Sequence, residues 1–328
     1  MATTSIQSDI TEAARRFNVD CNLKYEVQSA THFVFQVEAV DSGQTVIDES
    51  LTLTPPTSVQ RHTHSPSNNR LIRLDVMPGL FELNYRATVE LAPQLPSGEG
   101  LPESPVSSIP FDYIHLLAPT RYCESDLLAS ASQKMFSQYA PGWERVEHIR
   151  QWIHDNIEYS TGSTTTTSTA CDVFLQRTGV CRDFAHLGIA FCRALNIPAR
   201  FVVGYVNFPE GAPDFHALFE AWIGTRWVLF DATDMAPIDE LIRVGTGRDA
   251  KDVPFATFFG EARMLSMSPA VEQVGGSRPS APILSPAPKP QLARPAYAVC
   301  HYSHQTLPLC ATSRIGHPPS DVSAAWQP

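Results

Sequence analysis

The sequence predicts an α+β protein in which an antiparallel β module precedes helices that pack on a second antiparallel sheet. Apolar and polar residues alternate with period two over much of residues 20–92, whereas apolar residues recur every three to four positions between residues 125 and 157. Further period-two segments follow residue 198. Helices therefore come before the strands of the second half, an order that is typical of α+β proteins.

Length and charge limit the classes of function. The chain has 328 residues, which predicts two domains, and its net charge of -10 without a cluster of Lys and Arg argues against a nucleic-acid partner. No apolar segment reaches the ~20 residues that span a bilayer. The first residues also lack the pattern of a secretory signal. We therefore expect a cytoplasmic protein with no membrane partner; the oligomeric state stays open.

The first half of the chain divides into an N-terminal arm at residues 1–19 and the β module at residues 20–115. Within the module, Asp41-Ser42-Gly43 predicts a hairpin turn and Pro78-Gly79 a second turn between alternating segments. Residues 92–110 contain many prolines and glycines, so we interpret them as the linker between domains.

Residues 116–269 are expected to form the helix-containing core. Two amphipathic helices are separated by Pro141-Gly142, and the polar residues 159–170 predict a surface loop before a short helix at residues 171–177. A longer helix begins near residue 181. Strands are expected at residues 199–206, 215–223 and 226–232, with Gly224-Thr225 as the hairpin turn between the last two.

The C-terminal residues 270–328 hold ten of the 27 prolines and few periodic apolar positions. We expect this tail to be disordered or loosely attached. It contains Cys300 and Cys310 beside two histidines, but the spacing in "CHYSHQTLPLC" matches no zinc-finger pattern. No metal or other cofactor is therefore expected.

Cys181 is the first candidate for chemistry. The seven cysteines are odd in number, widely spaced and never arranged as CxxC, which argues against a disulfide framework or a structural zinc site. Cys181 lies in the first turn of the longer helix, whose apolar face consists of Phe184, Leu187, Phe191 and Leu195. Free N–H groups and the positive end of the helix dipole favour a thiolate there. The alternative is that Cys181 is only a small buried apolar residue.

His216 and Asp231 could complete an acyl-transfer site, which needs a proton carrier and a group that holds the carrier's tautomer. They lie 15 residues apart on the two expected strands that Gly224-Thr225 joins. Pairing about this turn places His216 slightly beyond Asp231, within reach of a hydrogen bond. In the alternative interpretation, His216 is a satisfied core residue and Asp231 caps the turn at Ala232-Thr233.

The segments "GVCRDFAHLGIAFCRALNIPARFVVGYV" and "DFHALFEAWIGTRWVLFDATD" resemble the transglutaminase-like superfamily. This papain-related group of Cys-His-Asp enzymes includes transglutaminases, microbial cysteine proteases and amide hydrolases. The resemblance runs from about Trp143 to Asp234, and it implies a papain-like core. The β module resembles the N-terminal β region of bacterial members. One departure is Leu218, where relatives typically have Trp after His-Ala.

The resemblance implies a role for each candidate residue. Cys181 would be the nucleophile, His216 the general acid and base, and Asp231 the group that orients the imidazole. The backbone N–H of Cys181 is the first candidate oxyanion donor, and Tyr159 or the loop after it is the second, with a plain core aromatic as the alternative for Tyr159. Asp183 either orients substrate or makes a local hydrogen bond at the helix N-terminus.

The expected function is hydrolysis of a peptide or isopeptide bond through a thioester on Cys181. The partner is then a peptide or protein that supplies the amide. Two alternatives stay open. An amine instead of water could resolve the thioester, as in transglutaminases, or the chain could be a non-catalytic scaffold whose β module binds a protein.

Overall fold

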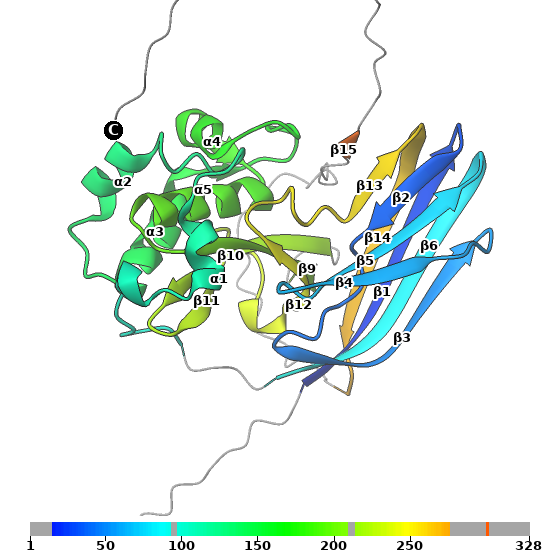
Figure 1. Cartoon of the computed structure of the whole chain (residues 1–328), viewed down its shortest axis with the longest axis horizontal. Helices are drawn as coiled ribbons and strands as arrows, with labels where there is room; N and C mark the ends of the chain where they lie inside the picture. The colour runs from blue at the N-terminus through cyan, green and yellow to red at the C-terminus, as the bar shows by residue number, and fades with distance from the viewer. Residues whose placement is uncertain (1–14, 93–96, 209–213, 276–299, 302–328) are drawn as a thin grey trace, which may run out of the picture.

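The computed structural model describes residues 15–92, 97–208, 214–275 and 300–301. They form a β-sandwich, at the right of Figure 1, and a helix-rich core at the left. The core consists of helices on an antiparallel sheet, so the α+β class predicted from the sequence is confirmed.

The sandwich consists of two sheets whose buried faces pack together. One has the strand order β14-β1-β6-β3 and the other the order β15-β13-β2-β5-β4. In β1 the buried side chains alternate with more exposed ones, as the period-two pattern predicts. The strands are β1 (Arg15–Val27), β2 (Thr31–Phe35), β3 (Gln44–Thr54), β4 (Gln60–His64), β5 (Asn69–Val76), β6 (Gly79–Leu91), β13 (Ala256–Phe259), β14 (Ala262–Gln273) and β15 (Cys300–His301).

Both turns expected in this region join strands of opposite sheets. Residues 41–43 precede β3 but follow β2, which lies in the other sheet, and Pro78-Gly79 lies between β5 and β6, which are also in different sheets. The hairpin predicted at Asp41-Ser42-Gly43 is therefore wrong. Its prediction failed because alternation shows that a strand has one buried face, but not which strand lies beside it.

The core is built on an antiparallel sheet of order β11-β10-β9-β12. Its strands are β9 (Ala199–Val206), β10 (Asp214–Ile223), β11 (Arg226–Phe230) and β12 (Ile242–Gly247), and a short parallel pair consists of β7 (Glu158–Tyr159) and β8 (Thr178–Gly179). The helices are α1 (Phe111–Ile114), α2 (Ala129–Phe136), α3 (Trp143–Asn156), α4 (Ala170–Gln176) and α5 (Cys181–Ala194), with 3-10 turns η1 (Val106–Ser108), η2 (His115–Leu117) and η3 (Ile238–Glu240).

Helix α5 lies at the centre of the core, between the sheet and the other helices (Figure 1). Almost all of its side chains are buried, as expected for a helix covered on every side. At Gly188 the helix backbone approaches the sheet so closely that a Cβ atom would lie 2.6 Å from the ring of Phe219. This contact sets the helix directly on β10, the strand that carries His216.

After the core sheet the chain returns to the sandwich. β13 pairs with β2, and β14 pairs with β1 along its whole length. The sequence predicts that residues 256–269 belong to the core, whereas in the structure this segment forms β13 and the first part of β14, which are strands of the sandwich. Residues 15–19 of the expected arm belong to β1, and residues 270–273 of the expected tail belong to β14, because both segments pair in the sandwich. The rest of the arm and most of the tail lie outside the described residues.

The described part of the expected linker packs against the core. The carbonyl of Pro102 accepts a hydrogen bond from the N–H of Gly224 at 2.9 Å. Glu103 forms an ion pair with Arg145 of α3 at 2.8 Å. The segment thus contacts both the β10–β11 turn and a helix.

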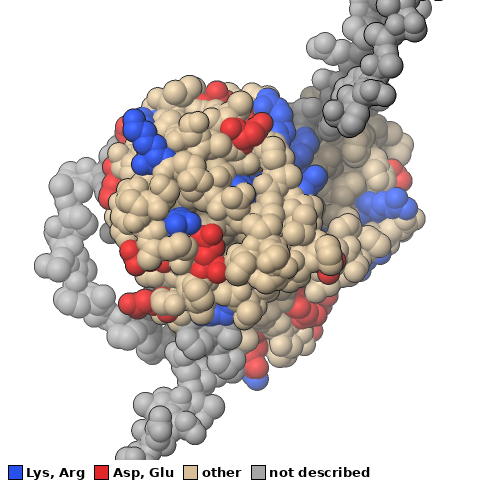
Figure 2. Space-filling view, turned by 60° about the vertical axis from the view of Figure 1, so that its left-hand side comes forward, with Lys and Arg blue, Asp and Glu red and all other residues tan. Residues whose placement is uncertain are grey.

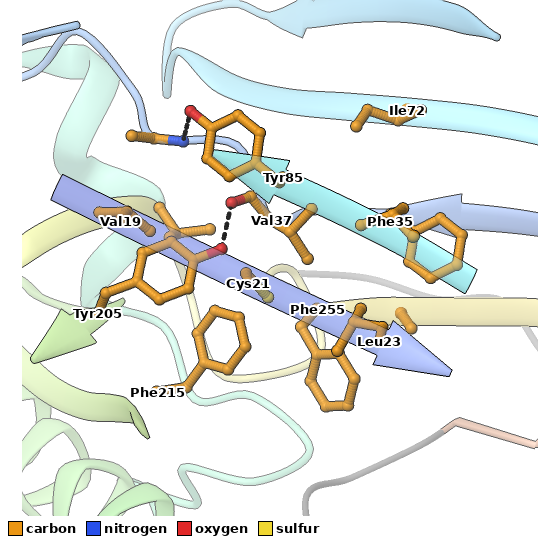
Figure 3. Close-up of a cluster of buried hydrophobic side chains, with 14 of the residues drawn as sticks. Val19, Cys21, Leu23, Phe35, Val37, Ile72, Tyr85, Tyr205, Phe215 and Phe255 are labelled. Atoms are coloured by element: carbon orange, nitrogen blue, oxygen red, sulfur yellow. Dashed lines mark hydrogen bonds between the residues drawn. The ribbon is translucent and has the colours of Figure 1, made fainter. Parts of the chain in front are cut away.

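The sandwich and the core sheet share one hydrophobic cluster (Figure 3). Tyr205 of β9 and Phe215 of β10 pack there with residues of the sandwich such as Cys21, and their rings lie 4.6 Å apart. The Tyr205 hydroxyl donates a hydrogen bond to the carbonyl of Val37 at 2.5 Å. The sandwich therefore supports the face of the core sheet opposite to α5.

Candidate active site

Cys181 is the first residue of α5, and the local sequence explains why the helix begins there. Thr178 and Gly179 are extended and pair with β7, and Val180 keeps an extended backbone with φ of -113° and ψ of 176°. The helix dipole therefore has its positive end at the thiol, an environment that favours negative charge. The side chain is buried, with 6% of its surface exposed.

His216 and Asp231 come together as the strand pairing predicts. Phe219 of β10 pairs with Phe230 of β11, so Asp231 emerges beside the start of β10. His216 Nε2 lies 2.9 Å from Asp231 Oδ2, and both side chains are buried. Cys181 is a further neighbour whose interaction with His216 raises the pKa of the imidazole. Because Nε2 faces the carboxylate, Nδ1 is the ring nitrogen that is left for the thiol.

The charged forms of His216 and Asp231 stabilise one another. Burial by itself lowers the pKa of His216, but the charge and hydrogen bond of Asp231, together with Cys181, outweigh it and raise that pKa to about 10. Burial likewise opposes ionisation of Asp231, yet His216 and Thr233 bring the pKa of the carboxyl below its ordinary value. An imidazolium beside a carboxylate is therefore the favoured state at neutral pH.

Thr233 and Arg150 hold the Asp231 turn, and the sequence reasoning did not assign either a role at the site. The backbone N–H and the hydroxyl of Thr233 donate to Asp231 Oδ1 at 2.8 and 2.7 Å. Arg150 of α3 donates to the Asp231 carbonyl at 3.4 Å. Asp231 therefore caps its own turn, as one of its two interpretations expects, and contacts His216 at the same time. The Asp-Ala-Thr sequence was the available signal, because an Asp side chain commonly bonds the backbone two residues later.

Tyr159 lies at the thiol. β7 runs parallel to β8, and this pairing places Tyr159 opposite Gly179, two residues before Cys181. Cys181 is the neighbour that acts on the hydroxyl of Tyr159, and the tyrosine ring packs against Phe184 with ring centroids 5.9 Å apart. Burial and the neighbouring Cys181 raise the pKa of Tyr159, so the hydroxyl keeps its proton and can donate it.

An aromatic wall stands beside the imidazole although residue 218 is Leu. Phe208 contacts His216 edge to face, with ring centroids 5.3 Å apart. Leu218 is buried in a separate small cluster with Val202 and Leu241. Phe208 follows β9 in the chain, and only the tertiary structure brings it to the site, so no local pattern could have identified it.

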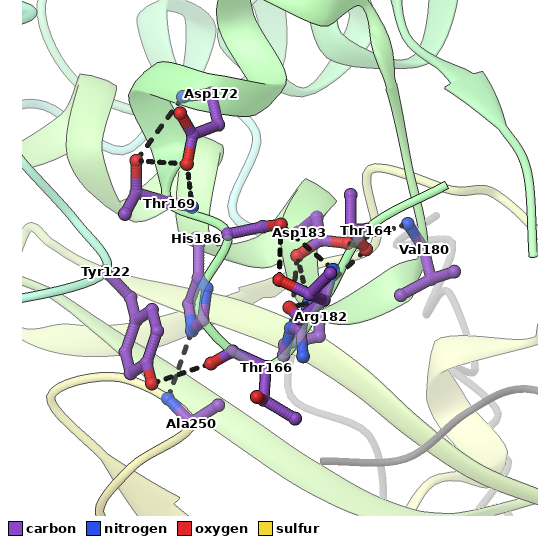
Figure 4. Close-up of polar contacts among 12 residues, drawn as sticks. Tyr122, Thr164, Thr166, Thr169, Asp172, Val180, Arg182, Asp183, His186 and Ala250 are labelled. Atoms are coloured by element: carbon purple, nitrogen blue, oxygen red, sulfur yellow. Dashed lines mark hydrogen bonds and ion pairs between the residues drawn. The ribbon is translucent and has the colours of Figure 1, made fainter. Parts of the chain in front are cut away.

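Asp183 is a helix-capping residue in this structure (Figure 4). Its Oδ2 accepts hydrogen bonds from the Val180 N–H at 3.0 Å and from the Thr164 hydroxyl at 2.5 Å. Its Oδ1 accepts from Arg182 at 2.7 Å. The side chain is 1% exposed and both oxygens are engaged. The geometry supports the local hydrogen bond at the helix start and gives no support to substrate binding.

The loop before α4, which contains the four consecutive threonines at residues 164–167, is held by hydrogen bonds to the start of α5 and to Tyr122. Arg182 donates to the Thr165 carbonyl at 2.8 Å, and the Tyr122 hydroxyl donates to the Thr166 carbonyl at 2.8 Å (Figure 4). His186 lies on the same helix but is buried away from Cys181: its ring stacks on Tyr122, and its Nε2 accepts from the Ala250 N–H at 3.1 Å. Burial keeps the pKa of His186 well below its usual range.

Four other cysteines whose side chains the structure describes have environments that favour the protonated thiol. Burial raises the pKa of Cys21 and of Cys123 to about 12, and burial with the nearby Glu124 does the same for Cys171. Cys192 is fully buried in the core cluster. Chemistry that needs a thiolate is therefore disfavoured at these four positions.

Metal-binding groups, membrane-spanning helices and surface charge each add one observation about the described residues. In the part of the chain that the structure describes, no three His, Cys, Asp or Glu side chains are grouped as metal ligands. No helix in the same residues is both long and apolar enough to cross a membrane. On the face in Figure 2, basic and acidic side chains are interspersed among uncharged ones.

Comparison with known proteins covers both parts of the chain. The family model described as the transglutaminase-like superfamily matches residues 129–232, and the one described as the bacterial transglutaminase N-terminal domain matches residues 15–109. The crystal structure of a candidate cysteine protease from Cytophaga hutchinsonii is similar, with 39% sequence identity and a TM-score of 0.74. That match covers 80% of this chain and 92% of the other.

Two uncharacterised mycobacterial proteins are also similar. The chain is 31% identical to one from Mycobacterium leprae over 145 residues, and 32% identical to one from Mycobacterium tuberculosis over 144 residues. These matches cover 42% and 40% of this chain, and 52% and 46% of the two relatives. The chain thus spans about half the length of the curated relatives it matches.

Proposed function

Because the chain belongs to the transglutaminase-like superfamily, we propose that it is a cysteine-dependent amide hydrolase with Cys181 as nucleophile. The observation that carries the proposal is the buried His216–Asp231 pair beside a thiol at a helix start. An imidazolium that is stabilised by a carboxylate can in turn stabilise a thiolate, which is the nucleophilic form. A buried cysteine of purely structural role does not need this pair.

The proposed reaction has two steps. In the first, Cys181 Sγ attacks the amide carbonyl, the C–N bond breaks, and His216 gives its proton to the departing amine. The product is a thioester on Cys181. In the second, a water loses a proton to His216 and attacks the thioester, which releases a carboxylic acid and restores the thiol. Asp231 stays ionised throughout and keeps the imidazole in the required tautomer.

The negative oxygen that forms in each step needs donors. The N–H of Cys181 is one candidate, since it belongs to the unpaired donors at the start of α5. The Tyr159 hydroxyl is the second, because it lies at the thiol and stays protonated. Both are proposals that rest on this geometry.

The proposed substrate is a peptide or protein in which a peptide or isopeptide bond is cut. The likeness to a candidate cysteine protease that covers most of both chains favours hydrolysis. Transfer of the acyl group to an amine is the alternative within the same chemistry. We keep the cytoplasm as the proposed location, and cell fractionation tests it.

Alkylation with iodoacetamide tests the nucleophile. Peptide mapping by mass spectrometry should find Cys181 labelled first at pH 6 to 7, before Cys171, which is a thiol of intermediate exposure and serves as the internal control. Cys181→Ala should abolish amide cleavage and fast labelling, whereas Cys171→Ala should change neither. Equal and slow labelling of all thiols would instead favour the non-catalytic scaffold.

A competition experiment separates the two acceptors. The protein is incubated with a glutamine-containing casein and a fluorescent primary amine, and both new carboxyl termini and incorporated fluorescence are measured. The proposal expects cleaved chains with little fluorescence. Fluorescent casein without cleavage would make the protein an acyltransferase instead, and Cys181→Ala controls for reactions that do not need the thiol.

A further inference from the structure

Thr233 directs both of its hydrogen-bond donors to the carboxylate of Asp231. Its N–H lies 2.8 Å and its hydroxyl 2.7 Å from Asp231 Oδ1. Asp231 Oδ2 is the oxygen that faces His216 Nε2 at 2.9 Å. The two carboxylate oxygens are therefore divided between two partners, and rotation of the carboxylate would break bonds on both sides.

The orientation of the Thr233 hydroxyl is itself determined. A hydroxyl has one proton to donate, and the short distance to Oδ1 assigns that proton to the carboxylate. On its acceptor side the oxygen lies 3.3 Å from the Met235 N–H. The 3.4 Å approach of the same oxygen to His216 Nε2 is longer, so it does not compete with Asp231 for the ring.

Burial makes the loss of the Thr233 hydrogen bonds costly for the carboxylate of Asp231. Thr233 is 7% exposed, Asp231 4% and His216 1%, so solvent offers few replacement donors for Oδ1. A buried acceptor that loses its partner costs more than an exposed one. The titratable and charged groups around the pair are Cys181, which interacts with the imidazole, and Arg150 at the Asp231 carbonyl, with Asp234 near Arg150.

We infer that Thr233 is a positioning residue that, through Asp231, keeps the Nε2–H of His216 on the carboxylate and Nδ1 toward Cys181. This inference rests on the proposed function for its catalytic meaning. Thr233 itself touches neither the thiol nor a substrate in this arrangement. Its hydroxyl acts by holding Oδ1, which leaves Oδ2 as the only carboxylate oxygen for the ring.

Four variants test the inference in the full chain. Thr233→Val and Thr233→Ala both remove the hydroxyl, the first with the same shape and the second with less crowding if the valine variant folds poorly. Thr233→Ser keeps the hydroxyl. Thr31→Val is the matched control, because Thr31 is a buried threonine of the sandwich whose hydroxyl donates to the Ser29 carbonyl at 2.8 Å.

Two readouts are used. The first is the NMR titration of His216 in histidine-labelled protein, with the signal assigned from His216→Gln. The second is the rate of alkylation of Cys181 by iodoacetamide at pH 7. We expect Thr233→Val and Thr233→Ala to shift the His216 midpoint to lower pH and to slow alkylation about 10-fold to 100-fold, the range of one lost hydrogen bond to a charged group. Thr233→Ser and Thr31→Val should match the wild type.

The outcomes decide the inference separately from the proposed function. If both hydroxyl-free variants keep the wild-type titration midpoint, or lose no more reactivity than Thr31→Val does, Thr233 has no positioning role. If the wild type labels Cys181 no faster than Cys171, the proposed thiol chemistry fails, while the His216 titration still decides what Thr233 does.

Discussion

Phe215 and His216, which are adjacent on β10, bury their side chains on opposite faces of the core sheet. Phe215 lies in the cluster that the core sheet shares with the sandwich, with its ring centroid 5.7 Å from that of Phe255, whereas His216 interacts with Cys181, the first residue of α5. Strand alternation produces this division. The sandwich consequently supports the strand whose opposite face carries the imidazole.

We predict that Phe215→Ala destabilises the whole chain. It removes a fully buried ring, so we expect the free energy of unfolding to fall by about 3 to 5 kcal/mol. Urea denaturation measures it. Phe111→Ala is the control, because Phe111 is 96% exposed and its loss should change stability by less than about 0.5 kcal/mol. If both changes lowered the free energy of unfolding by similar amounts, the shared cluster would contribute little to stability.

Asp231→Asn should lower the pKa of His216. Asp231 provides the main interactions that raise this pKa to about 10, and without its charge the effect of burial dominates. NMR titration should show the lower midpoint, and amide cleavage should fall about 100-fold or more. Asp183→Asn removes another buried carboxylate and should leave the His216 titration unchanged. An unchanged midpoint in Asp231→Asn would contradict the pairing.

The pair should also make stability depend on pH in a definite direction. The folded-state pKa of His216 is above the ordinary 6.5, so between about pH 6.5 and 10 the folded state keeps a proton that the unfolded chain has released. The free energy of unfolding contributed by His216 is therefore fully present below pH 6.5 and is lost as the pH rises toward 10.

Urea denaturation at pH 6, 8 and 10 checks this, comparing proteins with and without His216→Asn. Both carry Cys181→Ala so that the thiol does not titrate. The stability difference between them should shrink as the pH rises. Parallel curves would show that His216 holds no extra proton in the folded state.

Tyr159→Phe should separate oxyanion stabilisation from thiol reactivity. Loss of one oxyanion donor typically lowers kcat about 100-fold to 1000-fold. Alkylation by iodoacetamide forms no oxyanion, so its rate should change much less. The matched control is Tyr122→Phe, which removes a hydroxyl that bonds the Thr166 carbonyl in the neighbouring loop. If kcat and the rate of alkylation fell by the same factor, Tyr159 would act on the reactivity of the thiol and not on the oxyanion.

Asp183→Ala should reduce stability because it leaves the Val180 N–H, the Thr164 hydroxyl and Arg182 without their shared acceptor. We expect a loss of about 1 to 3 kcal/mol in the free energy of unfolding. Asp183→Asn keeps one oxygen acceptor and should lose less. If Asp183→Ala instead keeps its stability but raises KM, the residue binds substrate.

Local sequence determined where the main elements begin and what they carry. The extended residues before Cys181 and the apolar face after it define α5, and the Gly224-Thr225 turn sets the register that brings Asp231 toward His216. These features depend on residues close together in the chain. They could therefore be predicted without knowing the rest of the fold, and so could the order Cys, His, Asp.

Only the tertiary structure decided which strands pair and what surrounds the site. Alternation in the β module is the same whether neighbouring strands join in one sheet or divide between two, so the sandwich and the return of β14 to β1 could not be read from it. Contacts between distant segments bring Phe208 to His216 and bring the Thr164 hydroxyl to Asp183. Such contacts form because the whole chain buries its apolar surface and satisfies its buried polar groups together, and no local stretch contains that information.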